Sequence, residues 1–313
     1  MATKRAASAR PWGKTGPGFI IERNRGLDAV NYRHIFHAGN FADVFKHALL
    51  LELIAALTAK PKPLAFLDTH AGAGCYVLSG TDAERTGEFR QGVLRLIEQK
   101  APPAPLAAYL DLVRACNAQA RPGELSRYPG SPWLAASALR ANDRLVLCEI
   151  QESEYYQLSA LFEQDPRVRV YRRDGYAALK ALLPPKERRG LILIDAPFEG
   201  QEQEYRRIEA ALGEALERFP TGVYAVWYPI KLRQHVRPFH RWLAACGAKS
   251  VLALELLLHP DDSALRLNGC GLAIVNPPWR IERKLEPILD ALQELLQQGR
   301  HGTTQVIWLA GPD

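Results

Sequence analysis

The feature that most constrains the fold is a regular alternation of short apolar runs with longer segments of helical periodicity. Apolar runs occupy residues 64–67, 145–148 and 191–194, residues 168–171 (V-R-V-Y) are also predicted as a strand, and an acidic residue follows each of the four within a few positions. Later strands are predicted near residues 223–227, 251–258 and 272–275. This alternation predicts an α/β fold with a mostly parallel sheet and helices on both faces. In such folds ligands bind outside the carboxyl ends of the strands.

Two further regions precede or interrupt this alternation. Residues 41–57 carry apolar side chains at three- and four-residue spacing, and Asn40 is suited to cap the start of the resulting helix. Between residues 78 and 127 two helical segments, near residues 88–99 and 106–119, flank a proline-rich joint. We therefore expect an inserted helical subdomain at this point of the chain.

Charge and composition narrow the class of protein. The net charge is +6, but residues 1–30 hold six Lys or Arg against two acids, so the remaining chain carries only +2. Net charge is therefore weak evidence for a nucleic-acid partner. We expect residues 1–30 to form a disordered basic tail and residues 31–313 to form one domain.

Apolar runs and cysteines bear on the compartment. No apolar run approaches the roughly 18 residues that a membrane span needs. The five cysteines are odd in number and scattered, with no C-x-x-C pair. These features predict a cytoplasmic protein in a reducing compartment and argue against both a disulfide framework and a zinc site.

A glycine-containing turn follows the first predicted strand. Asp68 ends this strand, and the sequence A-G-A-G then places Gly72 and Gly74 where the backbone can approach a nucleotide-like ligand. The third glycine of the nicotinamide fingerprint G-x-G-x-x-G is missing. An acid with a single A-G-x-G turn is better suited to S-adenosylmethionine, although a purely structural turn is the alternative.

Acidic residues also end the second and third predicted strands. Glu149 stands where a carboxylate can accept hydrogen bonds from a ribose diol. Asp174 and Gly175 are placed to meet the adenine ring of the cofactor, although Asp174 taken alone is also typical of a turn before glycine. Three acids at three successive strand ends favour a common site.

The fourth predicted strand leads into D-A-P-F-E, which suits methyl transfer to an exocyclic adenine amine. The Asp195 carboxylate and the Ala196 carbonyl can accept the two N–H groups of such an amine, and Phe198 can stack on an extruded base. The usual motif is (D/N/S)-P-P-(Y/F/W), which residues 276–279 (N-P-P-W) match in full. Those residues follow the last predicted strand, so we interpret them as a turn that leads from strand to helix, away from the cofactor.

Six short motifs extend over most of the chain: Y-R-H-I-F-H-A-G-N-F-A-D-V-F-K-H, L-D-T-H-A-G-A-G, E-R-T-G-E-F, Y-P-G-S-P, R-R-G-L-I-L-I-D and W-Y-P. Together they closely resemble the bacterial 23S ribosomal RNA adenine-N6 methyltransferase family that modifies position 2030 of that RNA. The resemblance covers about residues 31–312. It implies a Rossmann-like, S-adenosylmethionine-dependent methyltransferase core with an inserted helical subdomain.

The resemblance also assigns roles to individual residues. It implies a catalytic role for Asp195 and a place for Lys46 at the methionine carboxylate of the cofactor. Where the family usually has D-P-P-Y, this chain has D-A-P-F. The substrate would be 23S ribosomal RNA, naked or partly assembled, and no metal is expected. The implied cofactor contacts are His47, His70, Ser131, Glu149, Asp174 and Gly175.

Some assignments remain open at this point. Tyr32 and His34 are placed near the substrate base, with a core or capping role as the alternative. A DNA adenine-N6 methyltransferase, a non-catalytic RNA-binding module that retains the cofactor pocket, and a metal-dependent hydrolase that uses the histidines are competing hypotheses. Oligomeric state is not predicted. The candidate phosphate contacts, each with a solvated surface role as the alternative, are Arg188, Arg189, Arg206, Arg207, Lys231, Arg233, Arg237 and Arg241.

Overall fold

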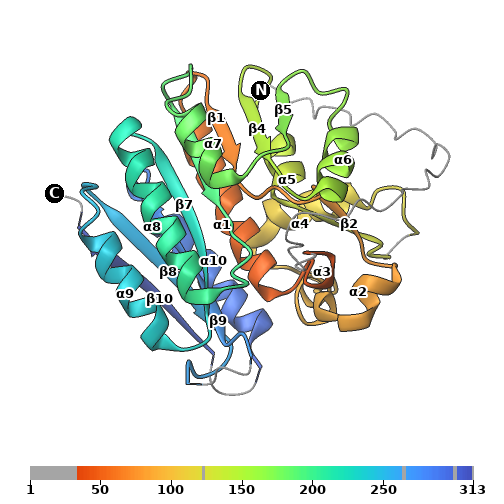
Figure 1. The fold of residues 1–313 in the computed structure, drawn as a ribbon. Helices are drawn as coiled ribbons and strands as arrows, with labels where there is room; N and C mark the ends of the chain where they lie inside the picture. Colours follow the sequence, from red (N-terminus) through yellow and green to blue (C-terminus); the bar gives the residue numbers. More distant parts are fainter. Residues whose placement is uncertain (1–33, 122–123, 263–265, 299–301, 312–313) are drawn as a thin grey trace, which may run out of the picture. The chain divides into compact units, whose positions relative to one another are not determined.

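An eight-stranded sheet forms the centre of the computed structural model, which describes residues 34–121, 124–262, 266–298 and 302–311 (Figure 1). Tyr32 and the basic tail lie outside these residues. The strand order is β10-β8-β9-β7-β6-β1-β4-β5. The strands are β1 (Ala65–Asp68), β4 (Arg144–Cys148), β5 (Val168–Tyr171), β6 (Gly190–Ile194), β7 (Val223–Ile230), β8 (Val251–Leu257), β9 (Gly269–Val275) and β10 (Thr303–Ala310).

The sheet is mixed but mostly parallel, as the alternation predicts. Strands β5, β4, β1, β6 and β7 pair in parallel. Strand β9 is antiparallel to β7 and to β8, and β10 is antiparallel to β8. Within this sheet of described strands, β9 and β10 therefore run against the other six. Strand β6 is buried along its whole length, which explains why it reads as an uninterrupted apolar run.

Helices cover both faces of the sheet (Figure 1). Because successive side chains of a strand point to opposite faces, Leu191 and Leu193 belong to one hydrophobic core while Ile192 and Ile194 belong to the other. The first core includes α1 (Phe41–Thr58), α4 (Ala107–Cys116), α5 (Ser131–Ala138), α6 (Glu152–Leu161) and α10 (Glu282–Leu296). The second includes α7 (Gly175–Leu182), α8 (Gln201–Arg218) and α9 (Arg233–Ala244).

The predicted helix before the first strand is confirmed as α1. Asn40 caps it, because its side-chain oxygen accepts a hydrogen bond from the Asp43 backbone N–H at 3.0 Å. Gly92, which lies in the segment between β1 and α5, packs directly against this cap. A Cβ at Gly92 would stand 2.1 Å from the Gly39 carbonyl oxygen. The start of α1 is thus held from outside by a backbone contact that only glycine permits.

The chain between β1 and α5 contains mostly short helices. They lie between β2 (Cys75–Val77) and β3 (Arg127–Pro129), which pair with each other as a separate antiparallel ribbon. The first described residues form η1 (His34–Phe36), and this segment contributes α2 (Thr81–Thr86), η2 (Glu88–Gln91), α3 (Val93–Ile97) and η3 (Ala104–Leu106), in addition to α4.

Among the elements that the sequence does not predict are α9, β10 and the ribbon of β2 and β3, and it predicts α10 only as a helix that follows residues 276–279. Helices α9 and α10 each contain an internal proline, Pro238 and Pro287, which normally argues against a helix. Both helices nevertheless bury a regular apolar face, so tertiary packing overrides the local preference. Among the described helices, none is both long enough and apolar enough to cross a membrane.

We expect two Gly→Ala substitutions to have opposite effects on stability. At Gly271 in β9 a Cβ would lie 2.4 Å from the buried Tyr228 hydroxyl, so Gly271→Ala should lower the free energy of unfolding by roughly 1–3 kcal/mol. Gly213 in α8 has no atom closer than 3.9 Å to such a Cβ, and Gly213→Ala should raise the free energy by roughly 0.5–1 kcal/mol. Urea unfolding measures both values, and equal effects would contradict the packing described here.

Candidate active site

The sheet brings the four strand-end acids to one edge. Asp68 ends β1, Glu149 follows β4, Asp174 follows β5 and Asp195 follows β6. Strand β1 pairs in parallel with β4 on one side and with β6 on the other, so their carboxyl ends are adjacent. The chain order reverses at β1, which is where open α/β sheets place their ligands. The structure therefore groups acids that are separated by 127 positions in the sequence.

The A-G-A-G turn has the backbone conformation that its glycines permit. Gly72 and Gly74 have φ angles of +59° and +77°, in the left-handed region. A Cβ on Gly72 would stand 2.1 Å from the Tyr76 hydroxyl, and one on Gly74 would collide with leucine side chains of the helix that follows β4. The turn is therefore tight on both sides, and substitution at either glycine would displace it.

Glu149 binds this turn directly. Its Oε2 accepts a hydrogen bond from the Gly72 N–H at 2.8 Å, and its Oε1 accepts one from the Gln151 N–H at 2.6 Å. Burial raises the pKa of Glu149 even though these backbone donors oppose the shift. Each carboxylate oxygen retains a further lone pair, so hydrogen bonds to a diol remain available.

Asp68 is fully buried beneath the same turn. It accepts hydrogen bonds from the Ser131 hydroxyl at 2.7 Å and from the His70 N–H at 3.2 Å. Burial raises the pKa of Asp68 to about 7, although the hydrogen bond from Ser131 lowers it. Ser131 is the first residue of α5, so the start of that helix is fixed to the end of β1.

His70, Asp174 and Gly175 lie around the start of α7. Asp174 caps this helix, because its Oδ1 accepts from the Ala177 N–H at 2.9 Å. Gly175 packs on the backbone after β1, where a Cβ would stand 2.0 Å from the Thr69 carbonyl oxygen. The His70 Nδ1 is 2.8 Å from the Thr69 hydroxyl, and burial lowers the pKa of His70, which favours its neutral form.

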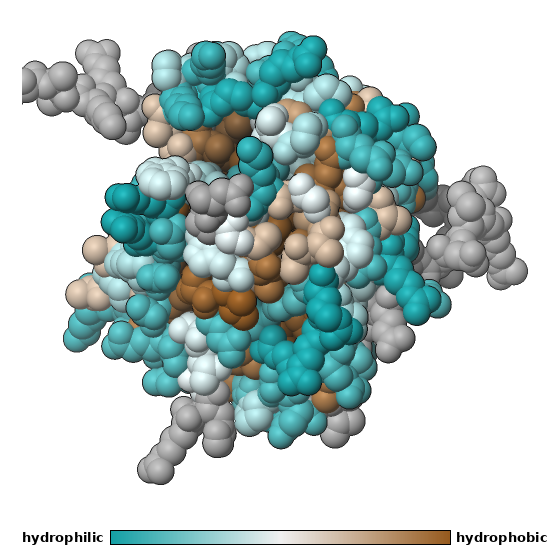
Figure 2. Space-filling model, turned by 90° about the vertical axis from the view of Figure 1, so that its left-hand side faces the viewer, coloured by the Kyte–Doolittle hydropathy of each residue, from teal (hydrophilic) through white to brown (hydrophobic). Residues whose placement is uncertain are grey.

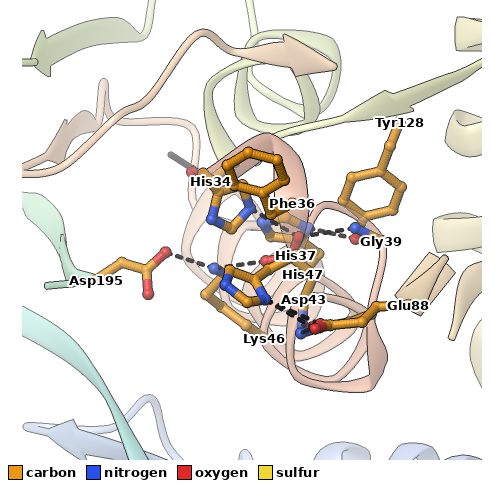
Figure 3. Close-up of polar contacts among 12 residues, drawn as sticks. His34, Phe36, His37, Gly39, Asp43, Lys46, His47, Glu88, Tyr128 and Asp195 are labelled. Carbon is orange, nitrogen blue, oxygen red and sulfur yellow. Dashed lines mark hydrogen bonds and ion pairs between the residues drawn. The ribbon is translucent and has the colours of Figure 1, made fainter. Parts of the chain in front are cut away.

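Lys46 joins α1 to the end of β6. Its Nζ lies 2.5 Å from Oδ2 of Asp195 and 2.9 Å from Oδ1 of Asp43, and the residue is only 4% exposed (Figure 3). Burial by itself would lower the pKa of Lys46, but the charges of Asp195 and Asp43 outweigh it and raise the pKa. Lys46 is therefore a cation enclosed by two carboxylates. Its predicted contact with the methionine carboxylate of the cofactor stays a prediction.

Asp43 is the site residue that sequence reasoning missed. Its buried carboxylate also lies 2.8 Å from His34 Nε2 and accepts a hydrogen bond from the Gly39 N–H at 3.0 Å (Figure 3). Burial opposes ionisation, but His34 and Lys46 hold the pKa of Asp43 well below its usual range. The sequence feature that could have indicated Asp43 is the D-x-x-K spacing, which places the side chains of Asp43 and Lys46 on one face of a helix.

His47 lies on the side of α1 that faces the inserted segment. Its Nδ1 is 2.7 Å from the Tyr128 hydroxyl, which in turn is 3.1 Å from the Tyr109 hydroxyl. Burial lowers the pKa of His47 to about 3, and the Lys46 charge contributes to the same shift, so the ring is neutral. The neighbouring residues Lys46 and His47 thus contact different parts of the molecule.

Ala196 and Phe198 follow Asp195 in the loop after β6. Phe198 has a φ of +50°, which is unusual for a residue with a side chain, and is 8% exposed. Its ring packs edge-on against Tyr205 and Trp227, with centroids 5.0 and 5.8 Å away. Stacking of Phe198 on a base therefore requires this loop to shift from the position it has here.

The rival N-P-P-W motif lies at the opposite edge of the sheet. Asn276 follows β9, and its side-chain amide donates to the Pro220 and Gly222 carbonyls just before β7. Trp279 is 80% exposed. The interpretation of this motif as a turn away from the strand-end acids is confirmed. In the described ranges no three His, Cys, Asp or Glu side chains are grouped to hold a metal ion.

The pKa of Asp68 predicts a pH dependence of stability. Between about pH 4 and pH 7 the unfolded chain has released this proton while the folded chain retains it, so folding stability falls as pH rises through this window. The slope from this one group is at most about 1.4 kcal/mol per pH unit. Asp68→Asn removes this titrating group. The free energy of unfolding of the variant, relative to that of the unsubstituted chain, should therefore rise between pH 5 and pH 7. Urea unfolding of the cofactor-free chain tests this, with the exposed Asp111→Asn as control, and identical pH profiles for Asp68→Asn and the unsubstituted chain would contradict it.

Comparison with known proteins agrees with this geometry. The family described as "Ribosomal RNA large subunit methyltransferase D, RlmJ" matches residues 61–310. The chain is 42% identical over 280 residues to the ribosomal RNA large subunit methyltransferase J of Escherichia coli K12, covering 90% of this chain and 99% of that protein. It is 40% identical over the same length to the protein of that name from Haemophilus influenzae, with the same coverage.

A solved structure shows the same fold. Protein LPL1258 from Legionella pneumophila superposes with a TM-score of 0.79 at 37% identity, over 87% of this chain and 98% of that protein. The family match extends from just before β1 through the last strand, and it includes every strand-end acid described above. The chain belongs to the RlmJ family of ribosomal RNA large subunit methyltransferases, which are S-adenosylmethionine-dependent enzymes.

Proposed function

We propose that this chain transfers the methyl group of S-adenosylmethionine to the N6 amine of one adenine in 23S ribosomal RNA, at position 2030. The observation that carries the proposal is the pairing of the buried Lys46 with the partly buried Asp195, beside the turn that Glu149 binds. Two relatives of this chain are named for methylation of large-subunit ribosomal RNA. The sequence resemblance supplies the base and the position.

The cofactor fits the groups at the strand ends. We propose that Glu149 accepts hydrogen bonds from the ribose diol, and that the Gly72–Gly74 turn lies against the amino acid end. Asp174 and Gly175 would meet the adenine ring, since α7 begins there. When bound, the cofactor supplies an electrophilic methyl on a sulfonium. Asp68 accepts hydrogen bonds from Ser131 and from the His70 N–H beside this turn, and the contacts of Asp68 and Ser131 with the cofactor stay predictions.

The target amine would meet Asp195 and the Ala196 carbonyl. The amine lone pair is delocalised into the ring, so two acceptors for its N–H groups favour the pyramidal geometry that transfer needs. Lys46 donates a hydrogen bond to Asp195 Oδ2 and so fixes the direction of this carboxylate. This is a positioning role, because the ammonium contacts carboxylates and is almost inaccessible to solvent. Tyr32 and His34 remain proposed neighbours of the base.

We expect Asp195→Asn to abolish most methyl transfer while leaving cofactor affinity within a few-fold. Loss of the charged acceptor should lower kcat by roughly 100–1000-fold. Labelled methyl transfer to deproteinised 23S RNA measures kcat, and calorimetry with S-adenosylhomocysteine measures affinity. The exposed Asp111→Asn on α4 is the matched control. Normal turnover in the Asp195→Asn variant, or methyl transfer to DNA alone by the unsubstituted chain, would contradict the proposal.

The residue after Asp195 offers a second test. Ala196 keeps the backbone carbonyl of the usual D-P-P-Y motif but lacks the rigidity of proline. Ala196→Pro should therefore keep or raise kcat. The same labelled-methyl assay measures it, and a thermal melt shows whether the variant still folds. A sharp fall in kcat in a folded variant would show that the loop has adapted around alanine.

The RNA backbone has a candidate contact surface on α9. Residues 219–254 contain no Asp or Glu but hold five Lys or Arg residues. Arg233 is paired with Glu255 and Asp261, whereas Arg237 and Arg241 are exposed one helical turn apart. Figure 2 shows the side of the molecule on which α8 and α9 lie, where hydrophilic side chains predominate. We propose that Arg237 and Arg241 contact RNA phosphates.

The double variant Arg237→Ala/Arg241→Ala should raise KM for RNA and leave cofactor affinity unchanged. It should also reduce the dependence of log KM on log salt by about 0.7 for each lost phosphate contact. Arg218→Ala/Lys249→Ala removes two exposed charges that precede β7 and β8, at the opposite edge of the sheet, and serves as the control. If log KM depends on log salt equally in both double variants, α9 does not contact the RNA.

A further inference from the structure

Two cysteines that are 41 positions apart meet next to the glycine turn. The Sγ atoms of Cys75 and Cys116 are 3.7 Å apart. Cys75 begins β2 immediately after Gly74, and Cys116 is the last residue of α4 in the inserted segment. Both are partly exposed, whereas Cys148 and Cys270 are buried. Neither thiol has a role in the proposed methyl transfer.

The two thiols are not equivalent. A hydrogen bond from the Cys116 thiol lowers the pKa of Cys75, and the charge of Arg127 on the neighbouring strand β3 lowers it further against the effect of burial. The same contact and burial raise the pKa of Cys116. Cys75 is therefore the thiol that ionises first, and Cys116 keeps its proton beside it. Thiolate character and access are what make a cysteine reactive to oxidants.

We propose that Cys75 and Cys116 form an oxidative modification site, at which a hydroperoxide converts the two thiols into a reversible disulfide. The bond joins the strand that leaves the glycine turn to the end of the inserted helix α4. A disulfide requires the Sγ atoms to approach from 3.7 Å to about 2.05 Å.

The chemistry balances with hydrogen peroxide as the oxidant. The Cys75 thiolate sulfur attacks one peroxide oxygen, an S–O bond forms, the O–O bond breaks, and the released hydroxide takes up a proton as water. Cys75 is thereby oxidised to a sulfenic acid. The Cys116 sulfur then attacks the Cys75 sulfur, the S–O bond breaks, and the leaving oxygen departs as a second water with the Cys116 proton. Two thiols and one peroxide give one disulfide and two waters.

The disulfide has a predicted effect on stability. It closes a loop of 41 positions that contains α2, α3 and α4, and a cross-link of this span reduces the conformational freedom of the unfolded chain. The oxidised protein should therefore melt at a higher temperature than the reduced protein. The shift should disappear when a thiol reductant is added.

Peroxide titration of the full-length reduced protein tests the site. We expect a mass loss of about 2 Da and a peptide that links Cys75 to Cys116, at peroxide concentrations below those that add oxygen to Cys246. Cys246 is also partly exposed and serves as the internal comparison. Oxidation of Cys246 without a link between Cys75 and Cys116 would overturn the proposal.

Three single variants separate the site from general oxidation. Cys75→Ser and Cys116→Ser should lose both the 2 Da change (about two hydrogen masses) and the rise in melting temperature, and Cys116→Ser should instead leave a sulfenic acid on Cys75 that dimedone traps. Cys246→Ser should behave like the unsubstituted protein. A disulfide that persists in Cys75→Ser, or absence of trapped sulfenic acid in a folded Cys116→Ser variant, would contradict the assigned roles.

Discussion

The arrangement of the site depends on one buried cation. Lys46 lies between Asp43 on its own helix and Asp195 after β6, so a single ammonium joins the segment before the sheet to the strand end proposed to hold the target amine. Breaking a buried ion pair leaves an uncompensated charge, at a cost of roughly 3–5 kcal/mol. The loop after β6 is therefore positioned together with the start of α1. The contact between Gly39 and Gly92 that holds α1 acts on both. The position of Asp195 thus depends on how the start of α1 packs as well as on β6 itself.

The acids at the sheet edge differ in environment, and this separates their roles. Asp195 is paired with a cation, Glu149 accepts two backbone N–H bonds, and Asp68 is fully buried with a pKa raised to about 7. Parallel strands bring these carboxyl groups to one edge, while local partners decide which one carries a negative charge toward a ligand. One acceptor paired with a cation and a second acceptor held by backbone N–H groups suit the roles proposed for them, at the target amine and at the cofactor ribose.

Much of the fold and part of the site could be predicted from the sequence, and the exceptions have physical reasons. Strand β6 is apolar throughout because both of its faces are buried, and strands β1 and β4 are almost as apolar, so these runs and the acids that follow them can be read from the sequence. Asp43 was missed because its importance comes from Lys46 and His34, which only the folded helix brings against it. The burial of Phe198 depends on Tyr205 and Trp227 from other elements. The cysteines were judged scattered, and their meeting results from how the inserted helices pack rather than from any spacing.

The central claim is that the Asp195 carboxylate faces the reacting methyl across the glycine turn. A crystal structure of the chain with S-adenosylhomocysteine and an adenine nucleotide tests it most directly. The account predicts the cofactor ribose at Glu149, its sulfur above the Gly72–Gly74 turn, and the N6 amine between that sulfur and the Asp195 carboxylate. A sulfur on the far side of the turn, with the Asp195 carboxylate out of reach of the nucleotide, would contradict it.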